Sequence, residues 1–278
     1  MHHGADPDQV TIFENVNGDG TQWEAHVFDD IGSHNAKVAD LNGDGFPDLA
    51  GKNYEAGALP LQVDVWINRL PTAGGEGLLA LDRWQRHIID ENRPWQAVFI
   101  TGGDINGDDL PDIVTGGWWY ENPGSASGDW DRHDIGGELY NMAVVYDFDR
   151  DGDLDILGTK GQPNSSEFLW AENDGAGSFT LHANLPPAEG DFLQGAAVIP
   201  AENGAGPKVV LSWHNRTGTQ LYHVPDPPPA TGHSRSSRRR RPARRWPSAI
   251  SMATATPIFI SAHSGCAPMA TPGRASRP

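Results

Sequence analysis

The amino-acid sequence predicts an all-β protein, and three observations carry this prediction. Glycine and proline are frequent, with 33 and 22 residues, and both favour turns over long helices. Short apolar segments alternate with polar turns, and no stretch keeps a helical hydrophobic period between helix caps. The same groups of residues also return several times along the chain. The 278 residues are therefore expected to form many short strands joined by turns.

Three recurring pieces define a repeat with a period of 43 to 64 residues. The first is an aromatic residue followed three positions later by histidine, at 23–26, 84–87, 130–133 and 179–182. The second is an aromatic segment that ends in asparagine, at 12–15, 65–68, 119–122 and 170–173. The third is an acidic turn between apolar runs, at 40–48, 104–112 and 147–155. Because the histidines recur in every unit, we expect them to pack within the repeat rather than to catalyse.

Each unit holds about four short apolar or aromatic segments: one before the acidic turn, one after it, the segment ending in asparagine and the segment containing histidine. Four strands per unit at this period is the pattern of a β-propeller blade, in which radial stacking buries both sheet faces. A solenoid of helix pairs would need helical periodicity, which is absent. We therefore predict a partial β-propeller of about four to five four-stranded blades over residues 1–225.

The acidic turns have the side chains of a metal site. Oxygen-bearing side chains stand at positions 1, 3, 5 and 9 of each turn, and a backbone carbonyl is available at position 7. An all-oxygen shell with several carboxylates suits calcium, whereas zinc would prefer histidine or cysteine. Two to three calcium ions are expected. The predicted ligands are Asp40, Asn42, Asp44, Asp48 and the carbonyl of Phe46; Asp104, Asn106, Asp108, Asp112 and the carbonyl of Leu110; and Asp147, Asp149, Asp151, Asp155 and the carbonyl of Asp153.

Other interpretations of these turns are weaker. A single acidic turn is more often just solvated. Three copies favour a cation, because carboxylates about 4 Å apart repel by roughly 4 kcal/mol per pair at an effective dielectric near 20. An EF-hand would need glutamate at position 12, where the turns have Gly51, Thr115 and Gly158. The second turn is the least favourable of the three, because Asp109 stands where the others have glycine.

A fourth turn is visible by alignment of residues 143–157 with residues 197–211. Its acidic positions have become Ala201, Asn203, Ala205 and Val209. We expect this turn to bind no metal.

The motif D-x-[DN]-x-D-G-x-x-D between two strands, with WWYENPG at 118–124 downstream, resembles the FG-GAP/VCBS repeat family, which is related to the integrin α-subunit propeller. The resemblance covers about residues 10–225. It implies calcium loops between the first and second strands of each blade, usually seven blades, and a secreted, periplasmic or cell-surface protein.

The charge separates the chain into two unlike parts. The net charge is −17, but residues 226–278 hold nine of the 20 basic and one of the 37 acidic residues, so residues 1–225 carry −25. A field of this sign repels nucleic acid and anionic membranes and favours cations or neutral ligands. We expect no nucleic-acid partner, no membrane insertion and a monomer. The one cysteine, Cys266, lies outside the acidic part.

Residues 226–278 look like a basic, disordered tail, and four consecutive arginines at 238–241 are typical of a nucleic-acid-binding arm. The genetic code suggests another origin. When codons are regrouped from the third base onward, residues 249–258 can encode D-L-D-G-D-G-D-x-D. The same shift lets residues 230–232 encode Asp-Trp and residues 263–267 encode Gln-Trp-Leu-Arg, which are blade motifs in the right order. We therefore expect a frameshift near residues 226–230 and a tail without function. At the other end, residues 10–15 already belong to the third segment of a unit, so half a blade and a signal peptide are expected upstream.

The propeller face opposite the acidic turns offers a ligand site. Its candidate residues lie at the entries to the first strands and the exits of the second: His34, Asn35, Trp95, Gln96, Trp118, Tyr140, Asn141, Gln194 and His214. Amides beside aromatics suit a neutral glycan, but the same amides could instead bond blade to blade, and the second interpretation is preferred.

Two functions follow. The first is a calcium-stabilised propeller that binds a glycan or protein without catalysis. The alternative is a carbohydrate-active enzyme, a polysaccharide lyase or sugar dehydratase, with His34, Lys52, Tyr140 and Lys160 as bases. The alternative requires these four side chains to meet in one pocket.

Overall fold

A computed structural model describes residues 9–30, 33–53, 61–69, 83–125, 127–200, 206–214 and 218–224, together with the backbone of residues 258–262. All regular structure in these residues is β-strand, as the sequence predicts. The described part of the chain contains no helix long and apolar enough to cross a membrane.

The strands form five antiparallel sheets, here called blades 1 to 5. In the part of the chain that the structure describes, blades 2, 3 and 4 have four strands each, and blades 1 and 5 have three. Blade 1 contains β18 (Ile258–Ala262), β1 (Val10–Asn15) and β2 (Trp23–Asp29); blade 2 contains β3 (Asn35–Ala39), β4 (Asp48–Lys52), β5 (Val63–Asn68) and β6 (Trp84–Asp90). Blade 3 contains β7 (Ile100–Gly103), β8 (Asp112–Thr115), β9 (Trp118–Tyr120) and β10 (Arg132–Asp134); blade 4 contains β11 (Leu139–Tyr146), β12 (Asp155–Lys160), β13 (Phe168–Asn173) and β14 (Phe179–His182). Blade 5 contains β15 (Leu193–Ile199), β16 (Lys208–Trp213) and β17 (Thr219–His223).

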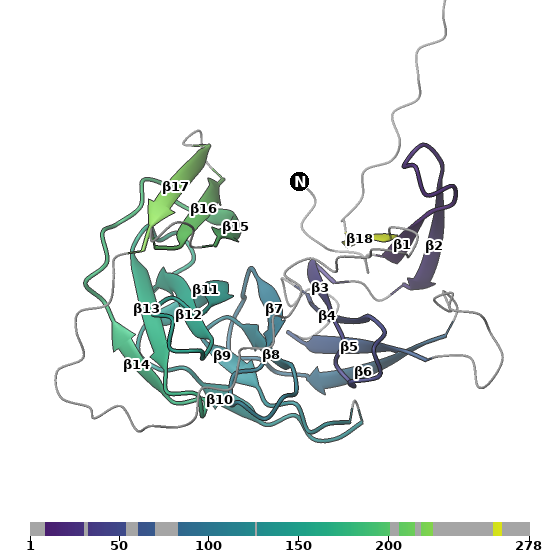
Figure 1. Ribbon diagram of the computed structural model, residues 1–278, viewed down its shortest axis with the longest axis horizontal. Helices are drawn as coiled ribbons and strands as arrows, with labels where there is room; N and C mark the ends of the chain where they lie inside the picture. The colour runs from purple at the N-terminus through teal and green to yellow at the C-terminus, as the bar shows by residue number, and fades with distance from the viewer. Residues whose placement is uncertain are drawn as a thin grey trace, which may run out of the picture.

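The sheets follow one another around an open arc, as blades of a propeller do (Figure 1). Their first strands are neighbours: β3 contacts β7, β7 contacts β11 and β11 contacts β15. Within each four-stranded blade the strands lie in sequence order, so each connection is a simple hairpin. The arc does not close into a ring within the described residues.

The apolar core lies between consecutive blades. One cluster joins blades 1 and 2 through Val10, Leu49 and Trp66, and the other two clusters fill the spaces between blades 2 and 3 and among blades 3, 4 and 5. Middle strands such as β5 and β8 are buried along their whole length, because a sheet covers each of their faces. The outer strand β2 is largely exposed.

Close packing of the strands explains the glycine at position 12 of two repeats. A Cβ atom on Gly158 would lie 2.5 Å from the carbonyl oxygen of Asn141 on the neighbouring strand. A Cβ on Gly51 would lie 2.5 Å from the Ser33 hydroxyl. Gly158 therefore allows close contact with the neighbouring strand, and Gly51 leaves room for the Ser33 side chain.

The predicted tail lies mostly outside the described residues. Five of its residues, Ile258–Ala262, form β18 and pair with β1. The degenerate fourth turn at 201–205 also lies outside the described residues. Within the described residues, β17 is the last strand of blade 5, just before the position where we expect the frameshift.

Candidate functional site: acidic loops and the opposite blade face

The three acidic turns occupy the same place in blades 2, 3 and 4. Each connects the first strand to the second: β3 to β4, β7 to β8 and β11 to β12. Position 1 follows the first strand and position 9 begins the second. The family resemblance implied this placement.

The first carboxylate of each turn organises the loop backbone. Asp40 accepts hydrogen bonds from the N–H groups of Asp44 and Gly45, at 3.1 and 2.9 Å. In the second turn, Asp104 accepts from Gly107, Asp108 and Asp109, at 2.8, 3.1 and 3.1 Å. The side chains at positions 3 and 5 likewise accept from backbone N–H groups two residues on, as in Asn42 and Asp44. The backbone N–H groups of each turn thus point toward the side-chain oxygens of the same turn.

The aspartate at position 9 has a structural role that the sequence did not reveal. Asp48, Asp112 and Asp155 are fully buried. Each accepts one N–H from position 2 of its loop and one from the recurring asparagine at or just after the end of the third strand, at 2.8 to 3.0 Å. Burial raises the pKa of Asp48 and Asp112 to about 7 and that of Asp155 to about 8. A carboxylate has about four acceptor positions, so these two bonds leave room for a cation.

The third turn gives the clearest metal geometry. Ligand atoms of Asp147, Asp149 and Asp151 all lie within 4.8 Å of one another. Asp147 Oδ1 is buried and has no hydrogen-bond partner among the described residues. Burial, followed by the charge of Asp151, raises the pKa of Asp149 to about 6. Three crowded carboxylates with an unused buried oxygen fit a hard divalent cation, which would offset their repulsion.

The other predicted ligands keep their places in the loops. Asn42 and Asn106 each donate their amide to the carboxylate at position 5, at 3.0 and 3.2 Å. The backbone N–H of position 7 also donates to the position 5 carboxylate, so the loop bends around that carboxylate. The donors are Phe46, Leu110 and Asp153. Ligation by their carbonyls and by position 9 stays a prediction.

The tight turns require positive φ at two positions. Position 6 has φ of 88° at Gly45, 71° at Asp109 and 107° at Gly152. Asp109 therefore adopts the conformation that the sequence analysis identified as unfavourable for it. Position 4 has φ of 67° at Arg150, where the other turns have glycine. The sequence analysis did not identify this second requirement.

In blades 3 and 4, the asparagine at or just after the end of the third strand joins the blade to its neighbour. Asn122 Nδ2 donates to the carbonyl of Pro111 in its own loop and to that of Leu41 in the loop of blade 2, both at 2.8 Å. Asn173 Nδ2 donates in the same way to Leu154, at 3.0 Å, and to Ile105 in the loop of blade 3, at 2.8 Å. Sequence analysis found the recurring asparagine but not this role as a blade clamp.

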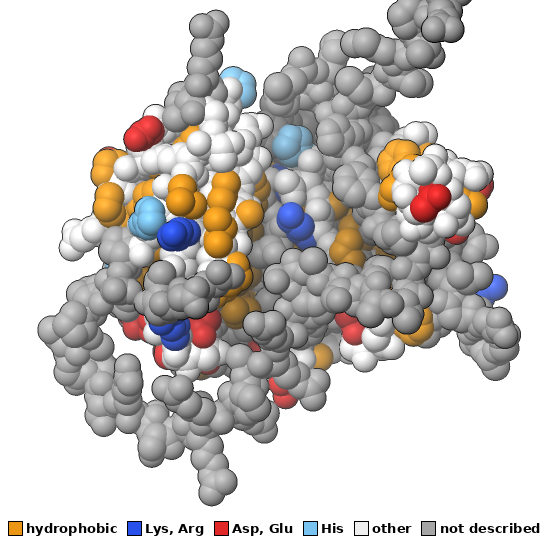
Figure 2. Space-filling model, turned by 45° about the horizontal axis from the view of Figure 1, so that its top comes forward, with side chains coloured by type: hydrophobic (Ala, Val, Ile, Leu, Met, Phe, Trp, Pro, Cys, Tyr) orange, Lys and Arg blue, Asp and Glu red, His pale blue; other side chains and the backbone are white. Residues whose placement is uncertain are grey.

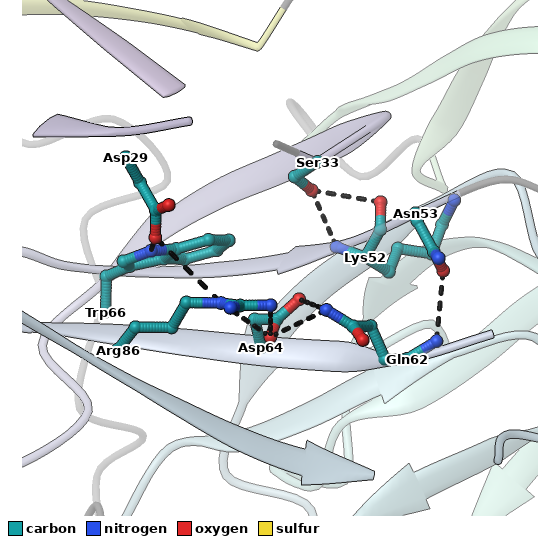
Figure 3. Close-up of polar contacts among 8 residues, drawn as sticks. All are labelled: Asp29, Ser33, Lys52, Asn53, Gln62, Asp64, Trp66 and Arg86. Atoms are coloured by element: carbon teal, nitrogen blue, oxygen red, sulfur yellow. Dashed lines mark hydrogen bonds and ion pairs between the residues drawn. The ribbon is translucent and has the colours of Figure 1, made fainter. Parts of the chain in front are cut away.

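A second link between blades uses an aspartate, an aromatic donor and an arginine (Figure 3). Asp29 at the end of β2 accepts from Trp66 Nε1 in blade 2 at 2.5 Å, and Arg86 pairs with both Asp64 and Asp29. At the next interface, Asp90 accepts from the Tyr120 hydroxyl at 2.7 Å and pairs with Arg132 at 2.8 Å. The arginines occupy the same repeat position, directly before the recurring histidine.

The recurring histidines pack within blades. Three of them pair with a glutamate on the adjacent strand: His26 with Glu14, His133 with Glu121 and His182 with Glu172. In blades 3 and 4 the imidazole also stacks on a tryptophan, with ring centroids 4.5 and 4.6 Å apart. This geometry agrees with the structural role expected for them.

On the opposite face, the structure brings three predicted aromatic residues together. Trp95 stacks on Tyr140 with centroids 5.3 Å apart and meets Trp118 edge to face at 4.7 Å. Trp95 Nε1 also donates to the Tyr140 carbonyl at 2.8 Å, which joins blades 3 and 4. Trp118 is buried, whereas Trp95 and Tyr140 are half-buried. This aromatic group therefore has a partly accessible surface.

The remaining predicted face residues differ in exposure. Asn141 is buried and its Oδ1 accepts from the N–H of Val98 at 3.0 Å, so it bonds across blades. Asn35 and Gln96 are half-buried, and His34, Gln194 and His214 are exposed. The blade-to-blade interpretation of the amides thus has direct support at Asn141.

The four residues of the enzyme alternative fall into two pairs. His34 and Lys52 are joined through the backbone of blade 2, and Tyr140 and Lys160 belong to blade 4, with blade 3 between them. Lys160 Nζ pairs with Glu138 at 3.1 Å and Glu167 at 3.8 Å. Lys52 is fully buried. The two lysines therefore lie in different surroundings.

Lys52 provides a test of its own role. Its Nζ has no hydrogen-bond partner among the described residues, and burial, aided by the charge of Arg93, lowers its pKa well below the usual value. We expect Lys52→Met to stabilise the protein by about 1–3 kcal/mol, because it removes an unsatisfied buried amine and keeps the apolar stem. Thermal melting measures this effect, with Lys160→Met as the surface control. A melting temperature lowered by Lys52→Met would show that the amine has a partner or ligand.

Comparison with known proteins adds no name to this geometry. The sequence matches no protein-family model and no curated protein. The blades and loops themselves define the class: an all-β protein of repeated four-stranded sheets whose acidic clusters could bind metal ions.

Proposed function

We propose that this protein is a calcium-stabilised β-propeller of the FG-GAP/VCBS kind that binds a neutral glycan or a protein through the face opposite its acidic loops. The observation that carries the proposal is the threefold repetition of one loop, at the same strand junction and with the same backbone bonds. It acts outside the cell, in the periplasm or at the cell surface, and performs no catalysis. The complete ring has seven blades, as the resemblance implies.

Calcium fits the loops better than other common metals. Carboxylates, amides and backbone carbonyls supply only oxygen ligands, which hard cations prefer. Magnesium keeps several waters and demands a small octahedral shell, whereas a nine-residue loop with five oxygen-bearing positions offers a larger and more adaptable one. Millimolar calcium outside the cell would keep such loops filled.

The aromatic group of Trp95, Trp118 and Tyr140 supports the ligand assignment. Half-buried aromatic rings present an apolar surface with polar edges, which suits the apolar face of a sugar ring. The body charge of −25 disfavours anionic glycans and nucleic acids. A neutral oligosaccharide is therefore the first ligand class to test.

Binding to a panel of neutral oligosaccharides, measured by calorimetry in calcium, tests this assignment. Tyr140→Ala is expected to weaken binding about tenfold, because loss of one stacking ring costs roughly 1–1.5 kcal/mol. Trp23→Ala is the matched control, since Trp23 is an exposed aromatic on the outer strand of blade 1. If no neutral oligosaccharide binds, or if both variants weaken binding equally, the aromatic group is not the ligand site.

A further inference from the structure

Blade 2 contains a buried lysine that the blade fold does not require. Lys52 is the last residue of β4 and is fully buried. The same repeat position holds Gly116 in blade 3 and Thr159 in blade 4, so those two blades form without a cation at this place. A buried amine without a partner lowers the stability of the folded state. The presence of Lys52 in blade 2 therefore needs an explanation other than blade formation.

The backbone of Lys52 is fixed by hydrogen bonds on both sides (Figure 3). Ser33 Oγ accepts from the Lys52 N–H at 2.7 Å, and the N–H of His34 donates to the Lys52 carbonyl at 2.8 Å. At Lys52, β4 also pairs with Asn35 of β3 and with Val63 of β5. The end of β4 therefore cannot carry the amine to the surface without opening blade 2.

The Lys52 amine, in contrast to the backbone, has no protein partner in the described part of the chain. Its Nζ makes no hydrogen bond there, and no carboxylate acts on its charge. Lys160, by comparison, pairs with both Glu138 and Glu167. An ammonium group has three N–H donors and no acceptor. The donors of Lys52 are thus available to a ligand that can accept hydrogen bonds.

A second buried cation acts on this amine. Arg93 follows β6 and is buried. Its guanidinium donates to the Trp95 carbonyl at 2.7 Å and to the carbonyl of Asn53, the residue after Lys52. Burial, followed by repulsion from Arg93, lowers the pKa of Lys52. Two positive groups in one buried region favour a ligand of negative charge.

The surroundings of Lys52 favour a small anion. An anion accepts the N–H groups of the amine, and its charge offsets the cost of burying an ammonium group near a guanidinium group. Because Lys52 is fully buried, a large ligand could not reach Nζ while the rest of the ligand stayed in water. Chloride is the simplest ion with these properties.

Surface charge offers no comparable site on the face that Figure 2 draws. Lys and Arg side chains form separate small patches there, among apolar and uncharged groups. The charge of −25 on residues 1–225 opposes anions, but salt screens such a field within about 8 Å at physiological ionic strength. An amine in direct contact with the anion therefore outweighs the distant negative charges.

We infer that Lys52 and Arg93 form a buried site in blade 2 for a small monovalent anion such as chloride. The anion joins the end of β4 to the segment that follows β6, so it acts as a structural ion. The site depends neither on the proposed calcium loops nor on the proposed glycan face.

Chloride-dependent melting of the full chain tests this site. Melts in saturating calcium gluconate compare potassium gluconate with potassium chloride at equal ionic strength. The melting temperature of the parent protein should rise by about 5–10 °C when free chloride reaches about a hundred times its dissociation constant. In gluconate alone, Lys52→Met should melt above the parent protein, because it removes an amine without a partner. Chloride should not raise its melting temperature further, whereas Lys160→Met should respond as the parent protein does.

Two results of these melts would overturn the anion site. One is a parent melting temperature that does not change with chloride or with nitrate. The other is a chloride-dependent rise that Lys52→Met retains in full, because this would be a general effect of salt. Bromide gives a second measurement that needs no variant, since its anomalous X-ray scattering locates it in crystals of the parent protein. One bromide ion is expected beside Lys52 Nζ, and bromide found only elsewhere would also contradict the site.

Discussion

Chelation of calcium is expected to lower the melting temperature of the protein by about 15–30 °C. Each loop adds about 2.7 kcal/mol when free calcium is a hundred times its dissociation constant, and three loops add about 8 kcal/mol. For a domain of this size, each kcal/mol corresponds to about 2–4 °C. Without the ion, the converged carboxylates of Asp147, Asp149 and Asp151 repel one another. Calorimetric melts of residues 1–225 with calcium and with chelator measure the difference.

Substitution in the third loop shows whether the ion acts there. Asp147→Ala combined with Asp151→Ala should remove about a third of the calcium-dependent rise in melting temperature. Asp129→Ala combined with Asp131→Ala, which removes the same charge from the connection before β10, is the control. A calcium-dependent rise that is equal in both double variants would show that general charge screening, and not ligation, stabilises the protein.

Asn173→Ala is expected to lower the melting temperature by about 5–15 °C. The substitution leaves the buried carbonyls of Ile105 and Leu154 without their amide donor, which costs roughly 2–4 kcal/mol, and it separates blade 4 from the loop of blade 3. Asn122→Ala should have a similar effect at the interface between blades 2 and 3. Thermal melting in saturating calcium separates this loss from any loss of metal.

Asn68→Ala is the matched control for the blade clamp. It occupies the same repeat position and is equally buried, but its amide has no partner in the described part of the chain. Its cost should therefore stay well below that of Asn173→Ala. Equal costs for the two variants would mean that the asparagines stabilise the protein by packing alone.

The blades could be predicted from sequence because their signals are local and repeated. The acidic turns lie between two short apolar runs, and the segments ending in asparagine or containing histidine recur in register with them. All three predicted turns connect a first to a second strand. The strained Asp109 was also visible, because a non-glycine residue stood where the other turns have glycine.

The contacts between blades could not be predicted, because they join residues far apart in the chain. Asn122 donates a hydrogen bond to Leu41, and Asn173 donates one to Ile105. The sequence around each asparagine does not indicate which distant residue accepts its hydrogen bond. The dual role of Asp48 was hidden for the same reason, since its second donor, Asn68, lies on another strand. The arginine before the histidine was a repeated signal that could have indicated the link to Asp90. The burial of Lys52 and the ion pairs of Lys160 also could not be predicted, because both depend on how the blades pack.

Counting the calcium ions bound per chain tests the central claim most directly. Equilibrium dialysis of residues 1–225 against calcium, followed by elemental analysis, should give three ions in the parent protein and two in the Asp147→Ala, Asp151→Ala variant. Magnesium at the same concentration should not displace them. Fewer than one bound ion in the parent protein, or an unchanged count in the variant, would contradict the assignment of the acidic loops as calcium sites.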